Sequence, residues 1–320
     1  MDVTMAIAAF GVGICVGLTG MGGGALMTPI LVFFFNVPPL AAVSSDLLSS
    51  AVMKPVGSFM HLRQKTSNLQ IVKWLIIGSV PAAFCGVLIL KLLGTSDTVQ
   101  NFIQTALGVA LLLSAILLVV RAYLRLLEHA RSRSGSGPPL PRARPSMPIR
   151  PLPTIMLGVI GGLLVGLTSV GSGSIIIIGL MVIYPGLRAS QLVGTDLAQA
   201  VPLVIAAAVG HAFFGDLQWG VAVPLIIGSV PGVLIGSKLA AVLAGGVVRR
   251  ALAFVLLGSG LKMLGLGNTS TIVLLIAVLL IAPAMWMLAR RRFGLHPLAS
   301  VQRKIDLENK AKSKPPNNSS

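Results

Sequence analysis

Long apolar runs are the feature that most restricts how this chain can fold. They include Trp74–Leu90, Phe102–Val120, Val221–Leu243 and Ile272–Leu288. Each is about as long as a helix that crosses roughly 30 Å of hydrocarbon, and none alternates strictly as a membrane β-strand would. Only 10% of the 320 residues are charged, whereas a soluble domain carries about 25%. The sequence therefore predicts an all-α polytopic membrane protein.

The sequence is also duplicated. The stretch LIIGSVP occurs at Leu75–Pro81 and again at Leu225–Pro231, 150 residues later. Other matches follow in the same order, 149 or 150 residues apart: VGLTGMGGG (Val16–Gly24) with VGLTSVGSG (Val165–Gly173), VSSDL (Val43–Leu47) with VGTDL (Val193–Leu197), and His61 with His211. Four matches in one order indicate two related halves.

Each half opens with an apolar segment that glycines interrupt. These segments are Met5–Asn36 and Pro153–Tyr184, and the pieces on either side of each interruption are short for a full crossing. We therefore expect each segment to form a hairpin of two half-helices with a glycine-rich tip. Further helices are expected at 41–60, 74–92 and 99–122 in the first half, and at 190–212, 220–242, 250–266 and 271–289 in the second.

The distribution of basic residues tests this topology, because cytoplasmic loops of membrane proteins are enriched in Lys and Arg. With two hairpins and an outside N-terminus, all but three of the 25 Lys and Arg residues fall on the inner side. The exceptions are Lys54, Lys91 and Lys262. If each hairpin were one crossing, the basic linker and the basic tail would lie on opposite sides. The hairpin arrangement therefore fits better, and it makes the two repeats inverted relative to each other.

These arguments divide the chain into five parts. They are an N-terminal membrane repeat (1–124), a basic cytoplasmic linker (125–152), a C-terminal membrane repeat (153–268), an extra transmembrane helix (269–292) and a basic cytoplasmic tail (293–320). Each repeat holds a broken glycine-rich hairpin plus three helices. The linker is rich in Pro, Ser and Gly and is expected to be irregular. The protein is expected to lie in the cell (inner or plasma) membrane.

Composition limits the partners and excludes several function classes. The net charge of +17 does not indicate nucleic-acid binding, because the basic residues lie in short loops and the tail. There we expect contact with anionic lipid headgroups. Cys15 and Cys85 lie in apolar segments, where small buried residues are expected rather than a disulfide or a metal site. The sequence has no nucleotide-binding loop, no metal-ligand cluster and no paired nucleophile and base. It predicts no cofactor and no enzyme activity.

The duplicated LIIGSVP stretches are expected mainly to pack helices together. Small residues recur every four positions through each copy (Gly78, Ala82, Gly86 and Gly228, Gly232, Gly236). Such a stripe lets two helix backbones approach closely in lipid. Contact with a substrate is the alternative.

The two hairpin tips are the candidate binding site. Irregular backbone near mid-membrane must be buried in protein or line a polar cavity, and glycine permits tight turns that expose amide N–H groups. Because the second half-helix of each hairpin starts at the tip, its positive dipole end would face an anion. The candidate anion-binding residues are Thr19, Gly20, Gly22, Gly23, Gly24, Ser45, Thr168, Ser169, Gly171, Ser172, Gly173, Ser174 and Thr195, with Ser44 as a further hydroxyl. Plain close packing of glycines is the alternative.

Two aspartates, Asp46 and Asp196, occupy equivalent positions in the helices that follow the hairpins. Ionisable residues inside membrane spans usually have a function. In one interpretation, each carboxylate caps its helix or accepts hydrogen bonds from the adjacent tip. In the other, the pair binds a coupling proton or a cation. Gln199 lies on the same helix face as Asp196, at i+3, and is expected to line the cavity.

Lys54 and two histidines complete the set of candidate polar groups. The counterpart of Lys54 is Val204. We expect Lys54 to pair with Asp46 through intermediate contacts, to offer its charge to an anion, or to reach the headgroups. His61 and His211 end equivalent helices, so an interfacial or capping role and a gating or pH-sensing role both stay open.

The motifs VGLTGMGGGALMTPIL, VSSDL and GSVPAAFCG resemble those of the TauE/SafE family, also called the TSUP family of sulfite exporters. The resemblance covers both halves, approximately Ala6–Ala244. It implies secondary transport of small sulfur-containing or organic anions of the sulfite, sulfonate or sulfoacetate type. The chain departs from the family's pattern at its second tip, which reads GSGS instead of GGG, and in Lys54, the basic linker and the basic tail.

Three functions follow from these observations. The favoured one is an anion transporter whose tips bind the anion at the midplane, with Asp46 and Asp196 orienting the tips or carrying a coupling proton. One repeat would move against the other to give alternating access. The alternative is a cation transporter or channel that uses both aspartates as ligands. The third is an intramembrane enzyme or a non-transporting membrane scaffold. The lack of a paired nucleophile and base argues against the enzyme.

Overall fold

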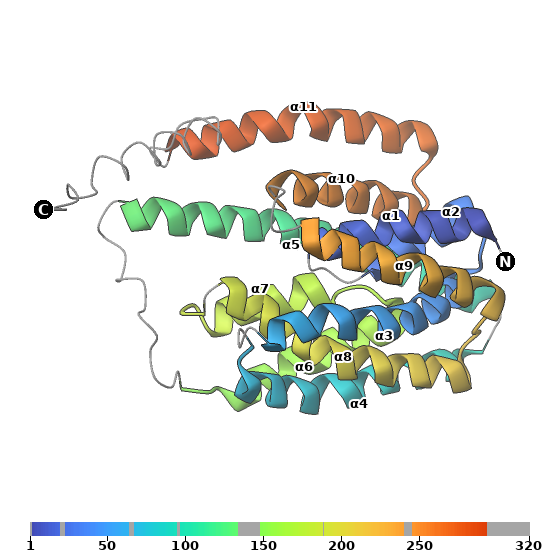
Figure 1. Ribbon diagram of the computed structural model, residues 1–320. Helices are drawn as coiled ribbons and strands as arrows, with labels where there is room; N and C mark the ends of the chain where they lie inside the picture. The colour runs from blue at the N-terminus through green and yellow to red at the C-terminus, as the bar shows by residue number, and fades with distance from the viewer. Residues whose placement is uncertain are drawn as a thin grey trace, which may run out of the picture. The chain divides into compact units, whose positions relative to one another are not determined.

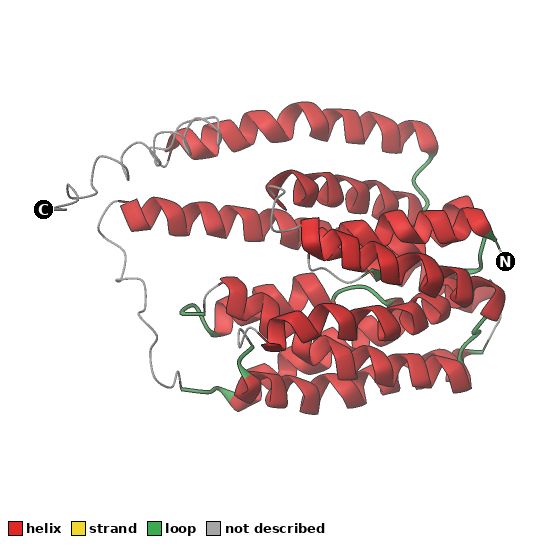
Figure 2. Ribbon diagram, viewed as in Figure 1, coloured by secondary structure: helices red, strands yellow, loops and turns green. Residues whose placement is uncertain are grey.

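The computed structural model of the protein describes residues 2–19, 23–63, 67–94, 97–133, 148–187, 189–239 and 245–292. Within these residues all regular secondary structure is helical (Figure 2). The all-α fold that the sequence predicts is therefore confirmed.

The helices follow the order expected from the sequence (Figure 1). The first half contains α1 (Val3–Thr19), α2 (Gly24–Phe34), α3 (Pro39–Arg63), α4 (Leu69–Leu93) and α5 (Asp97–Arg133). The second half contains α6 (Pro151–Thr168), a π-helical turn η1 (Ser172–Ile176), α7 (Ile177–Ile183), α8 (Ala189–Phe214), α9 (Trp219–Leu239), α10 (Gly245–Met263) and α11 (Asn268–Arg292).

One boundary differs clearly from the expectation. We expected a helix over 99–122 and an irregular linker after it, whereas α5 continues to Arg133. The extension is rich in Leu and Arg, which are among the best helix formers. The expectation of an irregular linker is therefore wrong for residues 125–133.

Six helices among the described residues are long and apolar enough to cross a membrane. They are Leu69–Leu93, Asp97–Leu124, Pro151–Thr168, Ser190–Phe214, Trp219–Leu239 and Asn268–Arg292. The remaining hairpin arms, namely α1, α2 and the continuous η1–α7 segment, are apolar but shorter. α3 is more polar, because it carries Asp46, Lys54 and several serines. The chain is thus a multi-pass membrane protein.

The chain forms two compact units, which are described separately. The first comprises residues 1–119 and 145–271 and holds nearly all of both repeats; the second comprises residues 120–144 and 272–320. In the second unit, α11 exposes apolar side chains along its length and ends in Arg290, Arg291 and Arg292. Its apolar surface suits lipid acyl chains, and its basic end suits a membrane interface.

The largest apolar core of the first unit gathers around α5. Ile103 and Leu107 of α5 are fully buried and belong to one cluster with Leu203 of α8 and Leu256 of α10. Val170, between α6 and η1, belongs to the same cluster. The second hairpin tip is therefore anchored in the core instead of facing lipid.

Crosswise contacts between the repeats hold the first unit together. α1 packs along α9, and α6 packs along α4 (Figure 1). Glycines allow the approach: a Cβ added to Gly13 would lie 2.5 Å from the carbonyl oxygen of Ser229. A Cβ added to its counterpart Gly162 would collide with the carbonyl of Ser79. Ser79 and Ser229 belong to the two LIIGSVP stretches, so the packing interpretation of these stretches is confirmed.

Two buried hydrogen bonds also join equivalent positions of the two repeats. Ser49 Oγ lies 3.0 Å from Ser229 Oγ, and Ser79 Oγ donates to Gln199 Oε1 at 3.2 Å. Ser49 and Gln199 are 150 residues apart, as are Ser79 and Ser229. In Figure 1, α1 begins at the right-hand end of the first unit and α6 begins at the left-hand end. The repeats therefore exchange equivalent contacts while their first helices start from opposite ends.

Candidate functional site

The second hairpin breaks between α6 and α7. After α6 ends at Thr168, Ser169 adopts a left-handed backbone conformation with φ 60°, and Gly171 follows with φ 119°. The π-helical turn η1 then begins at Ser172 and leads into α7. Turns of π-helix are frequent at functional sites. The predicted break in this hairpin is therefore confirmed.

The threonines that precede the two tips bond to the backbone of their own helices. Thr168 Oγ1 donates to the carbonyl of Leu164 at 2.6 Å and accepts from the amide of Val170 at 3.2 Å. Thr19 Oγ1 donates to the carbonyl of Cys15 at 2.7 Å. Both hydroxyls thus close the last turn of a broken helix, and in this conformation their hydrogens are already used.

The first tip lies against α3. Two of its candidate ligands, Gly20 and Gly22, lie outside the described residues. Gly23 is described: a Cβ there would lie 2.9 Å from Met53 Cε and 3.8 Å from Asp46 Oδ1. A side chain at this position would therefore displace the end of Met53 and come into van der Waals contact with the carboxylate of Asp46.

The two tips touch each other. A Cβ added to Gly24, at the start of α2, would overlap the carbonyl and hydroxyl oxygens of Ser169. Ser169 Oγ also donates a hydrogen bond to Asp46 Oδ2 of α3. An aspartate of the first repeat therefore holds the tip of the second repeat.

Neither aspartate caps its helix, because each lies about two turns inside it. Both are buried. Asp196 Oδ1 accepts from Gln199 Nε2 at 3.4 Å, and Gln199 in turn accepts from Ser79. The capping interpretation is therefore wrong. Hydrogen bonding to a tip applies to Asp46, although the tip belongs to the other repeat.

Lys54 connects the second tip with both aspartates. It is only 5% exposed, and its Nζ donates to Ser172 Oγ at 3.1 Å. Its ammonium group also interacts electrostatically with Asp196 and with Asp46. Of the three expectations for Lys54, the one in which it reaches the headgroups is wrong.

Ser45 and Thr195 are equivalent in sequence but differ in their contacts. Thr195 Oγ1 accepts from the backbone N–H of Asn68 at 3.0 Å, just before α4 begins. Ser45 is buried, and its hydroxyl has no hydrogen-bond partner in the described part of the chain. Thr195 therefore fixes the backbone at Asn68, whereas the hydroxyl of Ser45 can still donate and accept hydrogen bonds.

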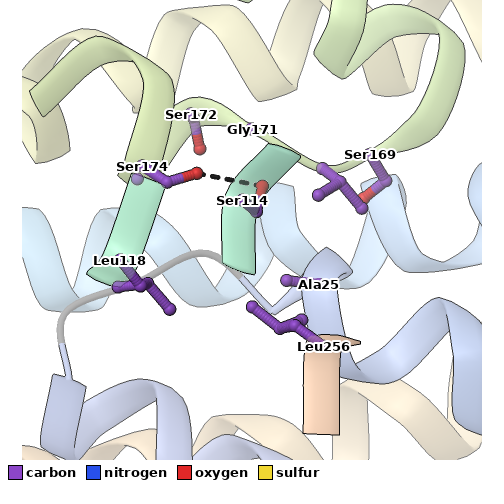
Figure 3. A pocket seen from close by; sticks show the side chains of 10 residues that line it. Ala25, Ser114, Leu118, Ser169, Gly171, Ser172, Ser174 and Leu256 are labelled. Atoms are coloured by element: carbon purple, nitrogen blue, oxygen red, sulfur yellow. Dashed lines mark hydrogen bonds between the residues drawn. The ribbon is translucent and has the colours of Figure 1, made fainter. Parts of the chain in front are cut away.

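A small cavity lies beside the second tip (Figure 3). Its volume is about 20 Å³, enough for about one water molecule. It is lined by the tip residues Ser169, Val170, Gly171, Ser172, Gly173 and Ser174, by Ser114 and Leu118 of α5, by Ala25 of α2 and by Leu256 of α10. Ser174 Oγ donates to Ser114 Oγ at 3.0 Å. Sequence reasoning missed Ser114, because a single serine in a long apolar helix gives no signal.

His211 is a buried link between the repeats and not an interfacial residue. Its Nδ1 lies 2.8 Å from Ser44 Oγ on α3, and its Nε2 lies 2.8 Å from the carbonyl oxygen of Gly166 on α6. A carbonyl only accepts, so Nε2 must donate. That bond satisfies a carbonyl in the last turn of α6, where no further helical N–H follows. The side chain of the equivalent His61 lies outside the described residues.

No group of three or more His, Cys, Asp or Glu side chains within the described residues could hold a metal ion. The polar groups that meet at the tips are instead hydroxyls, two carboxylates and one ammonium.

Broken hairpins that meet at a buried, charged centre of a multi-pass helical protein are the layout of a membrane transporter. The chain matches the family model described as Sulfite exporter TauE/SafE over residues 5–263. It therefore belongs to the TauE/SafE family of membrane transporters. The resemblance that the sequence motifs indicated is confirmed.

Two relatives from Bacillus subtilis (strain 168) support this assignment. The probable membrane transporter protein YjnA is 40% identical over 265 residues, which cover 82% of this chain and 100% of that protein. The probable membrane transporter protein YdhB is 28% identical over 231 residues, which cover 72% of this chain and 86% of that protein. No solved structure matches the chain. The family is described as one of exporters, and both relatives are described as probable membrane transporters.

Proposed function

We propose that the protein is a secondary transporter of small sulfur-containing or organic anions of the sulfite, sulfonate or sulfoacetate type. The observation that carries the proposal is the meeting of the two tips beside a buried lysine. Gly24 contacts Ser169, and Lys54 donates to Ser172 three residues further along the same tip. Hydroxyl donors, the N-terminal end of a helix and a buried ammonium all favour a negative ligand.

The second tip supplies backbone donors as well as side chains. η1 and α7 form one continuous helical segment that begins at Ser172. The first N–H groups of a helix have no partner within the helix. Here they lie at the wall of the cavity, because Ser172, Gly173 and Ser174 line it. An anion in an enlarged form of this cavity would accept from these amides and the neighbouring hydroxyls.

Alternating access around this site is part of the proposal. Inverted repeats would give two half-sites that open to opposite faces of the membrane. The crosswise packing of α1 on α9 and of α6 on α4 refines the expected movement. Because backbones in these pairs are in close contact, each moving body would contain helices from both repeats. The cavity of about 20 Å³ would represent a closed state between the two open ones.

Charge balance makes a coupling proton part of the same proposal. Lys54 carries one positive charge, whereas Asp46 and Asp196 carry two negative charges when both are ionised. Adding an anion to such a cluster would bury a further unpaired negative charge, which is costly. Uptake of a proton by one carboxylate would remove this cost. We therefore expect anion movement to follow a proton gradient.

Flux measurements in proteoliposomes test the proposal. Purified protein would be reconstituted and assayed with sulfite, methanesulfonate and sulfoacetate, with and without a pH gradient. At least one of these anions is expected to move, and faster when protons can move with it. Absence of flux for all three, together with flux of a monovalent cation, would reject the proposal.

A cation transporter or channel is the second candidate, because in the described part of the chain the buried carboxylates of Asp46 and Asp196 outnumber the buried ammonium of Lys54. The double substitution Asp46→Asn with Asp196→Asn separates the two functions. It would abolish cation binding if the aspartates are cation ligands. It would only weaken anion binding if the aspartates orient the tips and carry the proton.

Orientation in the cell membrane follows from the basic segments. We expect the linker (125–152) and the tail (293–320) to be cytoplasmic, where they contact anionic lipid headgroups. Protease treatment of right-side-out and inside-out vesicles checks this placement. Cleavage of the tail in right-side-out vesicles would contradict it.

A further inference from the structure

Two lysines that the expected topology places at the outer ends of helices lie over phenylalanine rings of the other repeat. Lys91 Nζ, in the last turn of α4, lies 4.1 Å from the centroid of the Phe214 ring at the end of α8. Lys262 Nζ, in the last turn of α10, lies 4.7 Å from the centroid of the Phe33 ring near the end of α2. A cation this close to a ring face is attracted to it. Each contact therefore joins one repeat to the other.

Hydrogen bonds to α5 show that both contacts lie at the same end of the first unit. Gln104 Nε2 donates to the carbonyl of Met263, at the end of α10, at 3.3 Å. Gln100 Oε1 accepts from the backbone N–H of Leu40, at the start of α3, at 3.2 Å. α4 ends shortly before α5 begins, so its end lies there too. The outer ends of α3 and α10 are thus bonded to α5.

α2 has no comparable bond at its outer end. Thr28 is the only residue of α2 with a polar side chain, and its buried hydroxyl has no hydrogen-bond partner within the described residues. The helix is otherwise held by apolar packing, which has no preferred direction. The contact between Phe33 and Lys262 is therefore the one directional interaction described for the side chains of α2.

The second hairpin is held together differently. Tyr184, which follows α7, places its hydroxyl oxygen 2.7 Å from Thr154 Oγ1 near the start of α6. The same oxygen accepts from the backbone N–H of Arg150 at 3.0 Å. The equivalent residues of the first hairpin are Phe35 and Met5, whose side chains cannot form such bonds. The two arms of the second hairpin are therefore joined at their base, whereas α2 is not joined to α1 in this way.

We propose that α2 is a gate at the outer face of the protein and that Lys262 holds it closed through the ring of Phe33. This inference rests on the proposed transport function, because a gate has a use only where a solute passes. The other end of α2 begins at Gly24, which lies against Ser169 of the second tip. Movement of the outer end of α2 would therefore open a path that leads to the tips.

The contact between Lys91 and Phe214 provides a matched comparison. α4 and α8 pack along each other, and the Phe84 ring meets the Phe214 ring edge-on with centroids 6.0 Å apart. Loss of this cation–π contact would leave α4 and α8 in place. The two contacts are thus similar in chemistry, but only the one at Lys262 is expected to control a movable helix.

Cysteine labelling tests the gate without requiring transport. Cys15 and Cys85 would be replaced by Ala, and Thr28→Cys would report on α2, because this buried position moves with the helix. A membrane-impermeant thiol reagent would be applied to right-side-out and to inside-out vesicles. Phe33→Leu keeps an apolar side chain but removes the ring. It should raise the labelling rate from the outer face about twofold to fivefold, the population shift expected for one exposed cation–π contact. Labelling from the inner face should not rise.

Three further variants in the same background sharpen the test. Lys262→Met should reproduce the effect of Phe33→Leu, whereas Lys262→Arg, which keeps a cation that stacks on rings, should label like the unaltered contact. Phe214→Leu removes the matched contact and should leave the outer labelling rate unchanged. A general loss of stability would raise labelling from both faces and would not give this pattern.

The outcomes separate the gate from the proposed function. An unchanged outer labelling rate in both Phe33→Leu and Lys262→Met would overturn the gate, and so would an equal rise in Phe214→Leu or a rise from both faces. If sulfur-containing anions are transported under these conditions, the proposed function still stands. The expected labelling pattern in a protein that moves none of these anions would support the gate and reject the proposed substrates.

Discussion

The two repeats differ most where they would touch a solute and least where they touch each other. Gly13 approaches the backbone at Ser229, and the equivalent Gly162 approaches the equivalent Ser79. At the tips, by contrast, Gly23 and Ala25 of the first repeat correspond in sequence to Ser172 and Ser174 of the second. Packing of one backbone against another leaves little choice of residue, because any Cβ collides. Side chains at a tip that borders a cavity can change without disturbing the helix packing. The two tips can therefore differ in their polar groups although their backbones are related.

The largest effect is expected at the shared packing positions. Gly13→Leu and Gly162→Leu each force a side chain into a backbone contact, and overpacking of this kind costs about 1–3 kcal/mol or more. Both variants should lose most of their folded, monodisperse protein in size-exclusion profiles after detergent extraction.

Gly11→Leu is the control on the same helix, because nothing lies within 4 Å of a Cβ at that position. It should behave like the unaltered protein. If Gly13→Leu folds well and Gly162→Leu does not, the packing of the two repeats is not equivalent.

The next effect separates the two aspartates. Asp46 accepts a hydrogen bond from the hydroxyl of Ser169 in the second tip. Asp196 accepts a hydrogen bond from the side-chain amide of Gln199 on its own helix. Asp46→Asn removes the charged acceptor of the second tip and should lower kcat/KM for anion uptake by about tenfold or more. Asp196→Asn should lower it less. Uptake rates at two external pH values check both variants, since proton coupling should be weakened in each. Equal losses in kcat/KM would show that the tip contact is not what distinguishes the pair.

A smaller effect is expected at His211, which satisfies the Gly166 carbonyl near the break in α6. His211→Ala leaves that buried acceptor unpaired, which costs about 1–3 kcal/mol. The unfolding temperature should fall by several degrees, as measured by thermal unfolding in detergent. His211→Gln, which keeps an N–H donor, should recover part of the loss. If neither variant changes the unfolding temperature, the carbonyl has another partner.

Sequence reasoning predicted the parts of the molecule that depend on local pattern. Apolar runs located the helices, and the repeated motifs located the breaks, because both signals lie within a few neighbouring residues. The linker was misjudged for a local reason as well: its first residues are good helix formers, so α5 continues to Arg133.

Contacts between distant residues could not be predicted in the same way. Lys54 bonds to Ser172, and His211 bonds to Ser44, across separations of 118 and 167 residues. These pairs depend on how the helices cross each other. The 3.6-residue period of one helix shows which of its faces is apolar but does not show which helix packs against that face. Ser114 illustrates the limit, since only the position of the second tip makes it part of the site.

The smallest effect distinguishes Ser45 from its counterpart Thr195. Thr195→Ala removes the acceptor for the backbone N–H of Asn68 and should cost about 1 kcal/mol of stability, with the KM for the anion unchanged. Ser45→Ala removes a buried hydroxyl that has no partner in the described part of the chain, so stability should stay the same or rise slightly. If the spare hydroxyl of Ser45 faces the solute during transport, KM should rise a few-fold in this variant alone. Thermal unfolding and uptake measured on the same preparations separate the two residues. A loss of stability in Ser45→Ala would mean that its hydroxyl is bonded within the protein.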